Sequence, residues 1–273
     1  MINLWLSLSA YGGLSTRRIL ETYQTAGIRF VELAIGPKPD PDTAEAIAAY
    51  RQCGFQYRAH HAFVWGDRHS PFNLSDDRID WSSLQARIDW MATLGITAYS
   101  VHAGHYAWDG DRTLAYERFL QNLERLHFEC YSAGITLGVE TMYSPAEPRP
   151  YRYLLDSVES IHDFLQTLPA IKLVLDLAHL NIGYGNERST LLSMLFAESD
   201  RLLEIHLSDN DGKQDLHSKI TPETWWIPWC NSLPKQIPLI LESRMNRKGS
   251  SFLRQEVERI QHWLQGGNER SQN

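Results

Sequence analysis

Short hydrophobic runs alternate with longer amphipathic segments along the whole chain. Eight runs have the length and composition of buried strands, and they lie at residues 4–8, 30–33, 57–63, 98–102, 136–141, 173–177, 203–207 and 237–242. Eight segments carry apolar residues at helical spacing, only weakly in the seventh, and they lie at residues 16–26, 41–53, 78–94, 111–132, 157–168, 190–198, 222–230 and 251–265. Such alternation requires a parallel sheet covered by helices, and eight repeats close into a barrel. The sequence therefore predicts an α/β fold, a single (β/α)8 TIM barrel.

Glycines punctuate this alternation at four corresponding joints. A helix should end and the next strand begin at Gly27, Gly54, Gly95 and Gly134, and glycine readily adopts the left-handed conformation of a helix C-cap. No linker, low-complexity tract or domain break interrupts the sequence before its last few residues. We therefore expect one barrel domain over residues 1–265 and a frayed, solvated tail over residues 266–273.

Composition narrows the classes of function. The formal net charge of −7 offers no broad cationic footprint for a nucleic-acid backbone. No run is long enough to span a membrane, and the start of the sequence lacks the basic segment of a signal peptide. The three cysteines are far apart and in no metal-binding spacing, which is typical of reduced thiols. These features predict a cytoplasmic protein with no membrane partner, and they leave a homo-oligomer open.

Four of the predicted strands carry a potential metal ligand at their last or next-to-last residue. These ligands are Glu140, Asp176, His206 and Glu242. In a β/α barrel, the carboxyl ends of all strands meet at the face that carries the active site. Gathered there, the four residues carry about three negative charges, which a buried site holds only with a compensating cation. Any one carboxylate can equally cap a helix or end its strand in solvent, but four at one level favour a divalent metal site.

Four local motifs surround these residues. They are Gly138-Val139-Glu140, Leu175-Asp176-Leu177-Ala178-His179, Ile205-His206-Leu207-Ser208-Asp209 and Leu241-Glu242-Ser243. Together they resemble the xylose isomerase-like barrel superfamily, which contains sugar isomerases and epimerases, inosose dehydratases and apurinic-site endonucleases. The resemblance covers nearly the whole chain. It implies that the metal is held, in chain order, by Glu140, Asp176, His206 and Glu242. The expected ion is Mn, Co, Mg or Zn, and no organic cofactor is expected.

The resemblance also implies a reaction. The cation would bind a ketose through its carbonyl and neighbouring hydroxyl and stabilise an enediolate. Glu140 and Glu242 would be the catalytic pair, one removing a proton and the other returning it. The expected function is a divalent-metal-dependent isomerase or epimerase of a small sugar, polyol or keto substrate, or a related lyase or dehydratase. A barrel that binds a sugar or a metal without turnover stays open as an alternative.

A second set of residues leaves a different reaction open. The endonuclease members place further zinc ligands at positions that here carry His61, His102, His179, Asp215 and His217. These residues would either hold additional metal ions or bind substrate. A multinuclear zinc site would imply an apurinic-site endonuclease-like phosphodiesterase, with nucleic acid as its partner. His60 and His61 are neighbours in a predicted strand, so only one can face the barrel, and we expect it to be His61.

Candidates for substrate binding lie on the same predicted rim. Trp108 offers an aromatic surface to the C–H face of a sugar ring, while Lys219 and Arg244 can hold an anionic group. Many relatives continue with a Gly-x-Gly loop after the residue that matches His217, but this chain continues with Ser218-Lys219-Ile220-Thr221-Pro222. The loop that covers the site is therefore expected to differ from that of the relatives.

Overall fold

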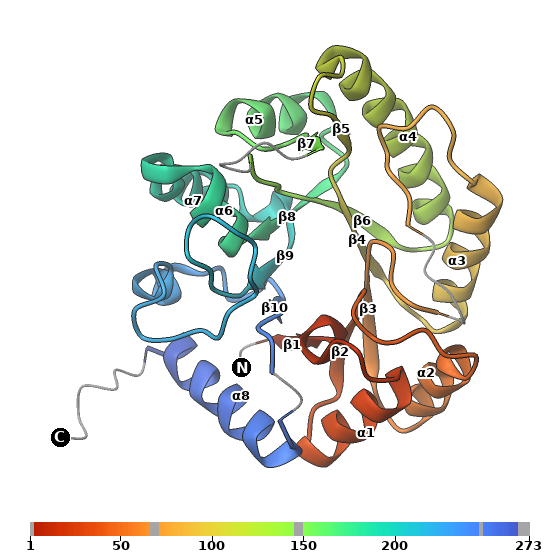
Figure 1. Cartoon of the computed structure of the whole chain (residues 1–273), viewed down its shortest axis with the longest axis vertical. Helices are drawn as coiled ribbons and strands as arrows, with labels where there is room; N and C mark the ends of the chain where they lie inside the picture. Colours follow the sequence, from red (N-terminus) through yellow and green to blue (C-terminus); the bar gives the residue numbers. More distant parts are fainter. Residues whose placement is uncertain (1–2, 66–70, 145–149, 246–247, 267–273) are drawn as a thin grey trace.

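The barrel is closed and parallel throughout. A computed structural model describes residues 3–65, 71–144, 150–245 and 248–266. Eight strands pair in the order β1-β10-β9-β8-β6-β4-β3-β2 and form the central ring in Figure 1. They are β1 Leu4–Ser7, β2 Phe30–Leu33, β3 Gln56–His60, β4 Ala98–His102, β6 Thr136–Glu140, β8 Lys172–Asp176, β9 Leu202–Leu207 and β10 Leu239–Leu241. The predicted (β/α)8 barrel is confirmed, while the predicted tail beyond Gly266 lies outside the described residues.

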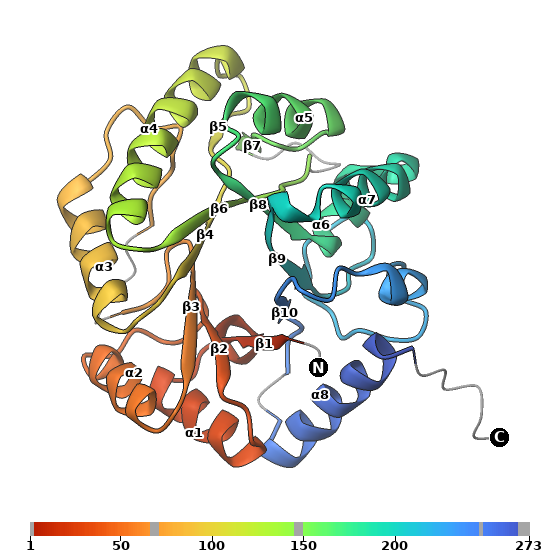
Figure 2. The ribbon, with the colours of Figure 1, turned by 180° about the vertical axis from the view of Figure 1, so that it is seen from behind.

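An outer ring of helices covers the strands, as the two opposite views in Figures 1 and 2 show. Its α-helices are α1 Thr16–Ala26, α2 Thr43–Gln52, α3 Trp81–Thr93, α4 Arg112–Ser132, α5 Val158–Thr167, α6 Leu177–Gly183, α7 Arg188–Ala197 and α8 Ser250–Leu264. In α1, Ile19 and Tyr23 are fully buried, because residues four apart share the face that packs on the barrel. Gly27 ends this helix at φ 85°, the left-handed cap that the sequence predicts.

Two connections differ from the sequence pattern. The pattern predicts one helix between β8 and β9, whereas the structure has two, α6 and α7. The carboxylate of Asp176 caps α6 by accepting a hydrogen bond from the backbone N–H of His179. The weak helix predicted over residues 222–230 is instead a 3-10 segment, Ile227–Ser232. Pro228 would lie inside the predicted helix, where it lacks the N–H that the helical hydrogen bond needs.

A small antiparallel sheet stands apart from the barrel. Its strands are β5 His105–Ala107 and β7 Tyr151–Tyr153, which belong to the loops after β4 and β6. Among the described residues, no helix is long and apolar enough to cross a membrane. Cys53, Cys130 and Cys230 are all free thiols.

The barrel interior contains a charged layer beneath the strand ends. Side chains two residues apart on a strand share a face, so Glu204 points to the same side of β9 as His206. Arg58 of β3 forms an ion pair with Glu204, which also accepts a hydrogen bond from the hydroxyl of Ser100. Since β3 and β9 are not neighbours in the barrel, this contact crosses its interior. A buried ion pair therefore lies directly beneath the C-terminal ends of the strands.

Candidate metal centre

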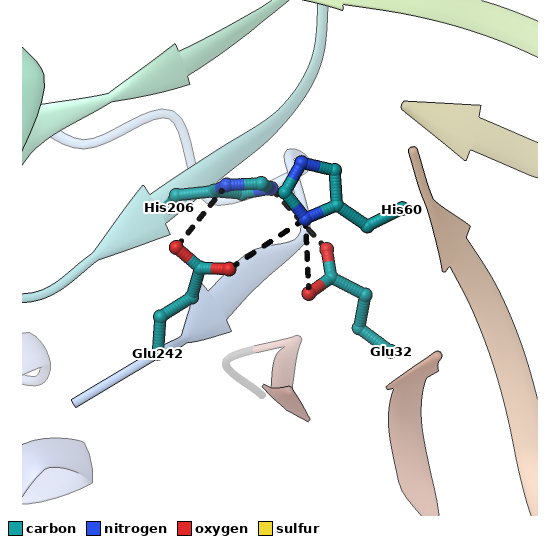
Figure 3. Close-up of side chains that lie close together, drawn as sticks. All are labelled: Glu32, His60, His206 and Glu242. Atoms are coloured by element: carbon teal, nitrogen blue, oxygen red, sulfur yellow. Dashed lines mark ion pairs between the residues drawn. The ribbon is translucent and has the colours of Figure 1, made fainter. Parts of the chain in front are cut away.

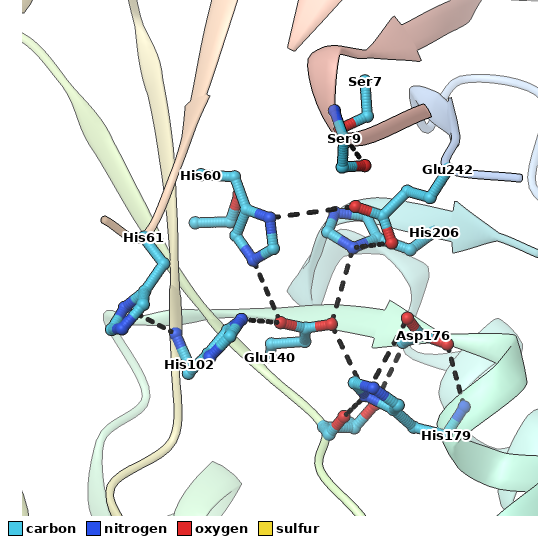
Figure 4. A network of polar contacts seen from close by, with 12 residues as sticks. Ser7, Ser9, His60, His61, His102, Glu140, Asp176, His179, His206 and Glu242 are labelled. Carbon is cyan, nitrogen blue, oxygen red and sulfur yellow. Dashed lines mark hydrogen bonds and ion pairs between the residues drawn. The ribbon is translucent and has the colours of Figure 1, made fainter. Parts of the chain in front are cut away.

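Polar side chains from six strands and from the segment after β10 converge at the C-terminal mouth of the barrel, and Figure 4 shows all of them except Glu32. The strand register brings them to one level, since His102 pairs with Glu140 and Asp176 pairs with His206. The converging residues are Glu32 of β2, His60 of β3, His102 of β4, Glu140 of β6, Asp176 of β8, His206 of β9 and Glu242, which follows β10. All except His102 are buried. The four residues predicted to hold a metal thus lie in one cluster.

Glu140 lies at the centre of this cluster. Its Oε2 is 3.1 Å from Nε2 of His60 and 3.3 Å from Nε2 of His102. Its Oε1 is 3.5 Å from Nδ1 of both His179 and His206. Burial alone would raise the pKa of Glu140, but the surrounding imidazoles hold it well below its usual value. Glu140 is therefore an ionised carboxylate whose two oxygens face different groups of histidines.

Three overlapping sets of side chains have the spacing of a metal site. In each set, one ligand atom per residue lies within 4.8 Å of the others. The sets are Glu140, Asp176 and His179; His60, His102 and Glu140; and Glu32, His60, His206 and Glu242, the last of which is drawn in Figure 3. Glu140 and His60 each belong to two sets. The mouth is therefore arranged so that more than one cation can be held.

The loop after β9 adds a further polar group. Oδ2 of Asp215 lies 3.1 Å from Nε2 of His217 and 3.6 Å from Nε2 of His179. Burial lowers the pKa of His217, but the hydrogen bond to Asp215 and the charge of Glu242 raise it to about 9. His217 has φ 47°, a strained conformation that persists where the surroundings enforce it. The structure thus brings Asp215 and His217 to the same cluster as His179.

Several buried polar atoms at the mouth are unsatisfied. Among the described residues, those without a hydrogen-bond partner include Oδ2 of Asp176, Nδ1 of His206, Oδ1 of Asp215, Nδ1 of His217 and both carboxylate oxygens of Glu32. Buried polar atoms are almost always paired, so a group of unpaired ones marks a place where a further partner binds. Carboxylate oxygens and imidazole nitrogens are ligands that Zn and Mn accept. The residues present therefore fit a divalent cation.

His60, and not His61, faces the barrel interior, so this expectation from the sequence is wrong. Strand β3 ends at His60, and the backbone turns at His61 with φ 41°. Strand alternation therefore does not extend to His61. Its ring stacks on that of His102, with centroids 4.2 Å apart and planes 8° apart. Burial holds the pKa of His61 well below its ordinary value, which suits a neutral ring that packs against His102.

A cavity of about 600 Å³ opens beside the cluster, lined among others by Ser9, Tyr11, His217 and Arg244. Its volume is in the range of small-molecule sites. Lys219 does not line this cavity, and its Nζ lies 3.0 Å from Oε1 of Glu256 on α8.

Trp108 also lies away from the cavity. Its ring is covered by the guanidinium of Arg152, whose Cζ is 3.9 Å from the ring centroid. Of the three predicted substrate-binding residues, Arg244 alone lines the cavity.

Sequence reasoning missed two buried acids of the barrel interior. Glu32 interrupts the hydrophobic strand Phe30–Leu33 and is fully buried. Glu204 lies two residues before His206 and is also fully buried. A charged residue inside a short hydrophobic run was the available signal, because a buried charge requires a partner.

One family comparison covers most of the chain. The sequence model of a family described as a xylose isomerase-like TIM barrel matches residues 20–247. A comparison with curated protein sequences gives no match.

Solved structures superpose on nearly the whole chain. A D-tagatose 3-epimerase-like protein has a TM-score of 0.76 at 15% identity, covering 99% of this chain and 100% of the other. A D-allulose 3-epimerase from Methylomonas sp. has a TM-score of 0.71 at 14% identity, covering 96% and 98%. An AP endonuclease of family 2 from Brucella melitensis has a TM-score of 0.69 at 16% identity, covering 94% and 99%. At such identities the likeness establishes the fold and leaves the reaction open.

Proposed function

Because the chain belongs to the xylose isomerase-like TIM-barrel family, we propose that it is a divalent-metal-dependent isomerase or epimerase of a small sugar, polyol or keto substrate. The observation that carries this proposal is the placement of Glu140 and Glu242. Oε1 of Glu140 and Oε2 of Glu242 each lie 3.5 Å from Nδ1 of His206. Two carboxylates from different strands thus meet at one imidazole nitrogen in the barrel mouth, which is the arrangement that metal-assisted proton transfer needs.

The residues that would hold the cation are Glu140, Asp176, His206 and Glu242. When bound, a Mn, Co, Mg or Zn ion supplies Lewis acidity: it polarises the substrate carbonyl and stabilises the negative charge that develops on deprotonation. No organic cofactor is needed for this chemistry. Asp176 and His206 would mainly hold the ion.

Glu140 and Glu242 move the proton. One carboxylate removes it from the carbon beside the carbonyl, and the other returns a proton. Return to the opposite face of the same carbon gives an epimer, while return to the neighbouring carbon gives an isomer. Both carboxylates are buried, so bulk water has little access to the deprotonated substrate.

The cavity beside the cluster supports a small substrate. Its volume of about 600 Å³ suits one sugar ring or open-chain sugar with room for solvent. Arg244 at its wall provides a bidentate donor for hydroxyl, carboxylate or phosphate oxygens. The similar solved structures include a D-tagatose 3-epimerase-like protein and a D-allulose 3-epimerase, which agrees with a ketose as the first substrate class to test.

A second candidate is a phosphodiesterase of the apurinic-site endonuclease type. It is favoured by the imidazoles beyond the four-residue site: Nε2 of His102 lies 3.3 Å from Glu140, and Nε2 of His179 lies 3.6 Å from Asp215. These contacts provide ligands for two or more cations, which could activate water and clamp a phosphate. One of the similar structures is named as an AP endonuclease. The net charge of −7 weighs against a nucleic-acid partner.

The deciding experiment is elemental analysis of gently purified protein, together with Glu140→Gln, His102→Ala and the control His162→Ala. His162 is an exposed residue of α5 whose ring contacts Gln166 and not the cluster. We expect one divalent ion per chain that is lost in Glu140→Gln and kept in both histidine variants. Incubation of loaded protein with ketoses in D₂O should then introduce deuterium at the carbon beside the carbonyl.

Two or three Zn ions per chain, reduced in number by His102→Ala but not by His162→Ala, would favour the phosphodiesterase over the isomerase or epimerase. A duplex with one abasic site would then be the substrate to test. Protein that binds no divalent ion, or that never exchanges a substrate proton, would contradict the isomerase proposal.

A further inference from the structure

Glu32 is a buried carboxylate with no conventional partner. It lies on β2, its exposure is 0%, and among the described residues neither of its oxygens takes part in a hydrogen bond. Two imidazoles lie next to its carboxylate, as Figure 3 shows. Oε2 of Glu32 is 3.3 Å from Nε2 of His206, and Oε1 is 3.9 Å from Nδ1 of His60. One carboxylate thus stands within ion-pair distance of two histidines.

The other nitrogen of each ring lies near Glu140, although Nδ1 of His60 also lies 3.8 Å from Oε1 of Glu242. Nδ1 of His206 lies 3.5 Å from both Glu140 and Glu242. Nε2 of His60 lies 3.1 Å from Glu140. Glu32 and Glu140 therefore approach opposite nitrogens of each ring.

An imidazole binds a metal through a nitrogen that carries no proton. The proton must then reside on the other nitrogen, and a carboxylate placed there holds both the tautomer and the orientation of the ring. We propose that Glu32 is the shared positioning residue of the metal centre: its negative charge, 3.3 Å from Nε2 of His206 and 3.9 Å from Nδ1 of His60, favours a proton on those two nitrogens. Nδ1 of His206, a residue of the proposed metal site, is thereby left free to bind the cation. This inference rests on the proposed metal-dependent function.

Glu204 also approaches His206, but its situation differs. Oε1 of Glu204 lies 3.4 Å from Nε2 of His206, and the two atoms are in hydrogen-bond geometry. However, the charge of Glu204 is already balanced by Arg58, and the hydroxyl of Ser100 donates to it. For Glu32, the ion pairs within the described chain are to His60 and His206 alone. Its negative charge is therefore compensated through the metal centre, which makes it the carboxylate coupled to metal binding.

The test uses Glu32→Gln and Glu32→Leu, with Thr43→Val as a matched control. Thr43 is also buried, and its Oγ1 lacks a hydrogen-bond partner, but it lies at the start of α2 away from the mouth. Two quantities are measured on full-length protein: the affinity for Mn²⁺ and Zn²⁺ by competition with a chelator, and the Tm of the metal-free form. Ions per chain are counted at saturation.

We expect both Glu32 variants to weaken metal binding by about 10–100-fold, with the larger loss in Glu32→Leu. The Tm of metal-free protein should stay the same or rise, because a poorly compensated buried carboxylate has been removed. Affinity and stability then move in opposite directions, which a merely structural role does not predict. Thr43→Val should leave the affinity unchanged.

Three results would overturn the inference. Unchanged affinity together with a lower Tm would make Glu32 a structural residue. Loss of one ion per chain at saturation would make it a direct ligand. Wild-type protein that binds neither ion would remove the proposed metal-dependent function itself, and this outcome is recognised without any variant.

Discussion

Nε2 of His60 lies 3.1 Å from Oε2 of Glu140, although the two residues are 80 positions apart in the chain. Their strands, β3 and β6, are separated by β4 in the barrel, so the contact spans the inside of the mouth. Burial lowers the pKa of His60, but the charges of Glu32 and Glu140 raise it to about 9. Without a cation, protonated His60 therefore stabilises the cluster of carboxylates.

Metal-free protein should lose stability as the pH rises from 6.5 to 9. The pKa of His60 is raised in the folded state from 6.5 to about 9, so its contribution is complete below pH 6.5 and is lost as the pH passes 9. His217 acts in the same window, because its pKa is also about 9. We expect the Tm in chelator to fall by on the order of 5 °C, measured by differential scanning fluorimetry.

The buried or half-buried carboxylates whose pKa is depressed, Glu140, Glu204 and Asp215, have the opposite sign and act only in acid. They therefore do not offset the fall in Tm between pH 6.5 and 9. In His60→Gln this fall in Tm should be smaller. A Tm that rises between these pH values would contradict the role assigned to the imidazoles.

Gly138→Ala should destabilise the protein and disturb the metal centre. A Cβ at Gly138 would lie 2.6 Å from Cδ2 and 3.0 Å from Cβ of Leu203, and 3.0 Å from Cγ2 of Val174. Overpacking of this kind costs about 1–3 kcal/mol in the free energy of unfolding, measured by urea denaturation. Because Gly138 is two residues before Glu140 on β6, metal affinity should fall as well.

Gly249→Ala is the control for this substitution, since nothing lies within 4 Å of its Cβ position. Its effect should be small and should leave metal affinity unchanged. Equal losses in the two variants would show that the tight contact at Gly138 does not matter.

Arg58→Met should be strongly destabilising, because it leaves Glu204 as an uncompensated charge inside the barrel. Breaking a buried pair in this way costs about 3–5 kcal/mol. The double variant Arg58→Met with Glu204→Gln should recover most of the loss, since neither charge then remains. Urea denaturation of the metal-free proteins measures both values. A double variant as unstable as the single one would mean that packing, and not charge, dominates.

Arg244→Gln should raise KM for a phosphorylated or carboxylated substrate by about 10-fold or more and leave kcat nearly unchanged. The reason is that a lost charge-assisted hydrogen bond weakens substrate binding in the ground state and the transition state alike. Arg244 lines the cavity. Lys219→Gln is the matched control, because Lys219 pairs with Glu256 outside this cavity. Steady-state kinetics on a ketose and on its phosphate would show whether Arg244 binds an anionic group of the substrate. Equal effects of the two variants on KM would rule out a specific role for Arg244.

Local pattern predicted well those features that depend on neighbours in the chain. The strands that deliver Glu140, Asp176 and His206 were predicted because a short hydrophobic run with a terminal polar residue is a local signal. The left-handed cap at Gly27 is equally local. The orientation of His60 was missed because strand β3 ends one residue before His61, and the turn there depends on contacts with β4. The helix α6 was missed because its cap, Asp176, is also the last residue of a strand.

The eight-fold alternation of strand and helix could be predicted from local sequence patterns, since it follows from periodicities of two to four residues. The chain order of the polar residues at the strand ends is equally a property of the sequence. The tertiary structure alone decided which of these residues meet. Closure of the barrel sets the register that places Glu32 of β2 behind His206 of β9 and carries Arg58 across to Glu204. Such contacts join strands far apart in the chain, and their geometry is fixed only when the whole sheet closes.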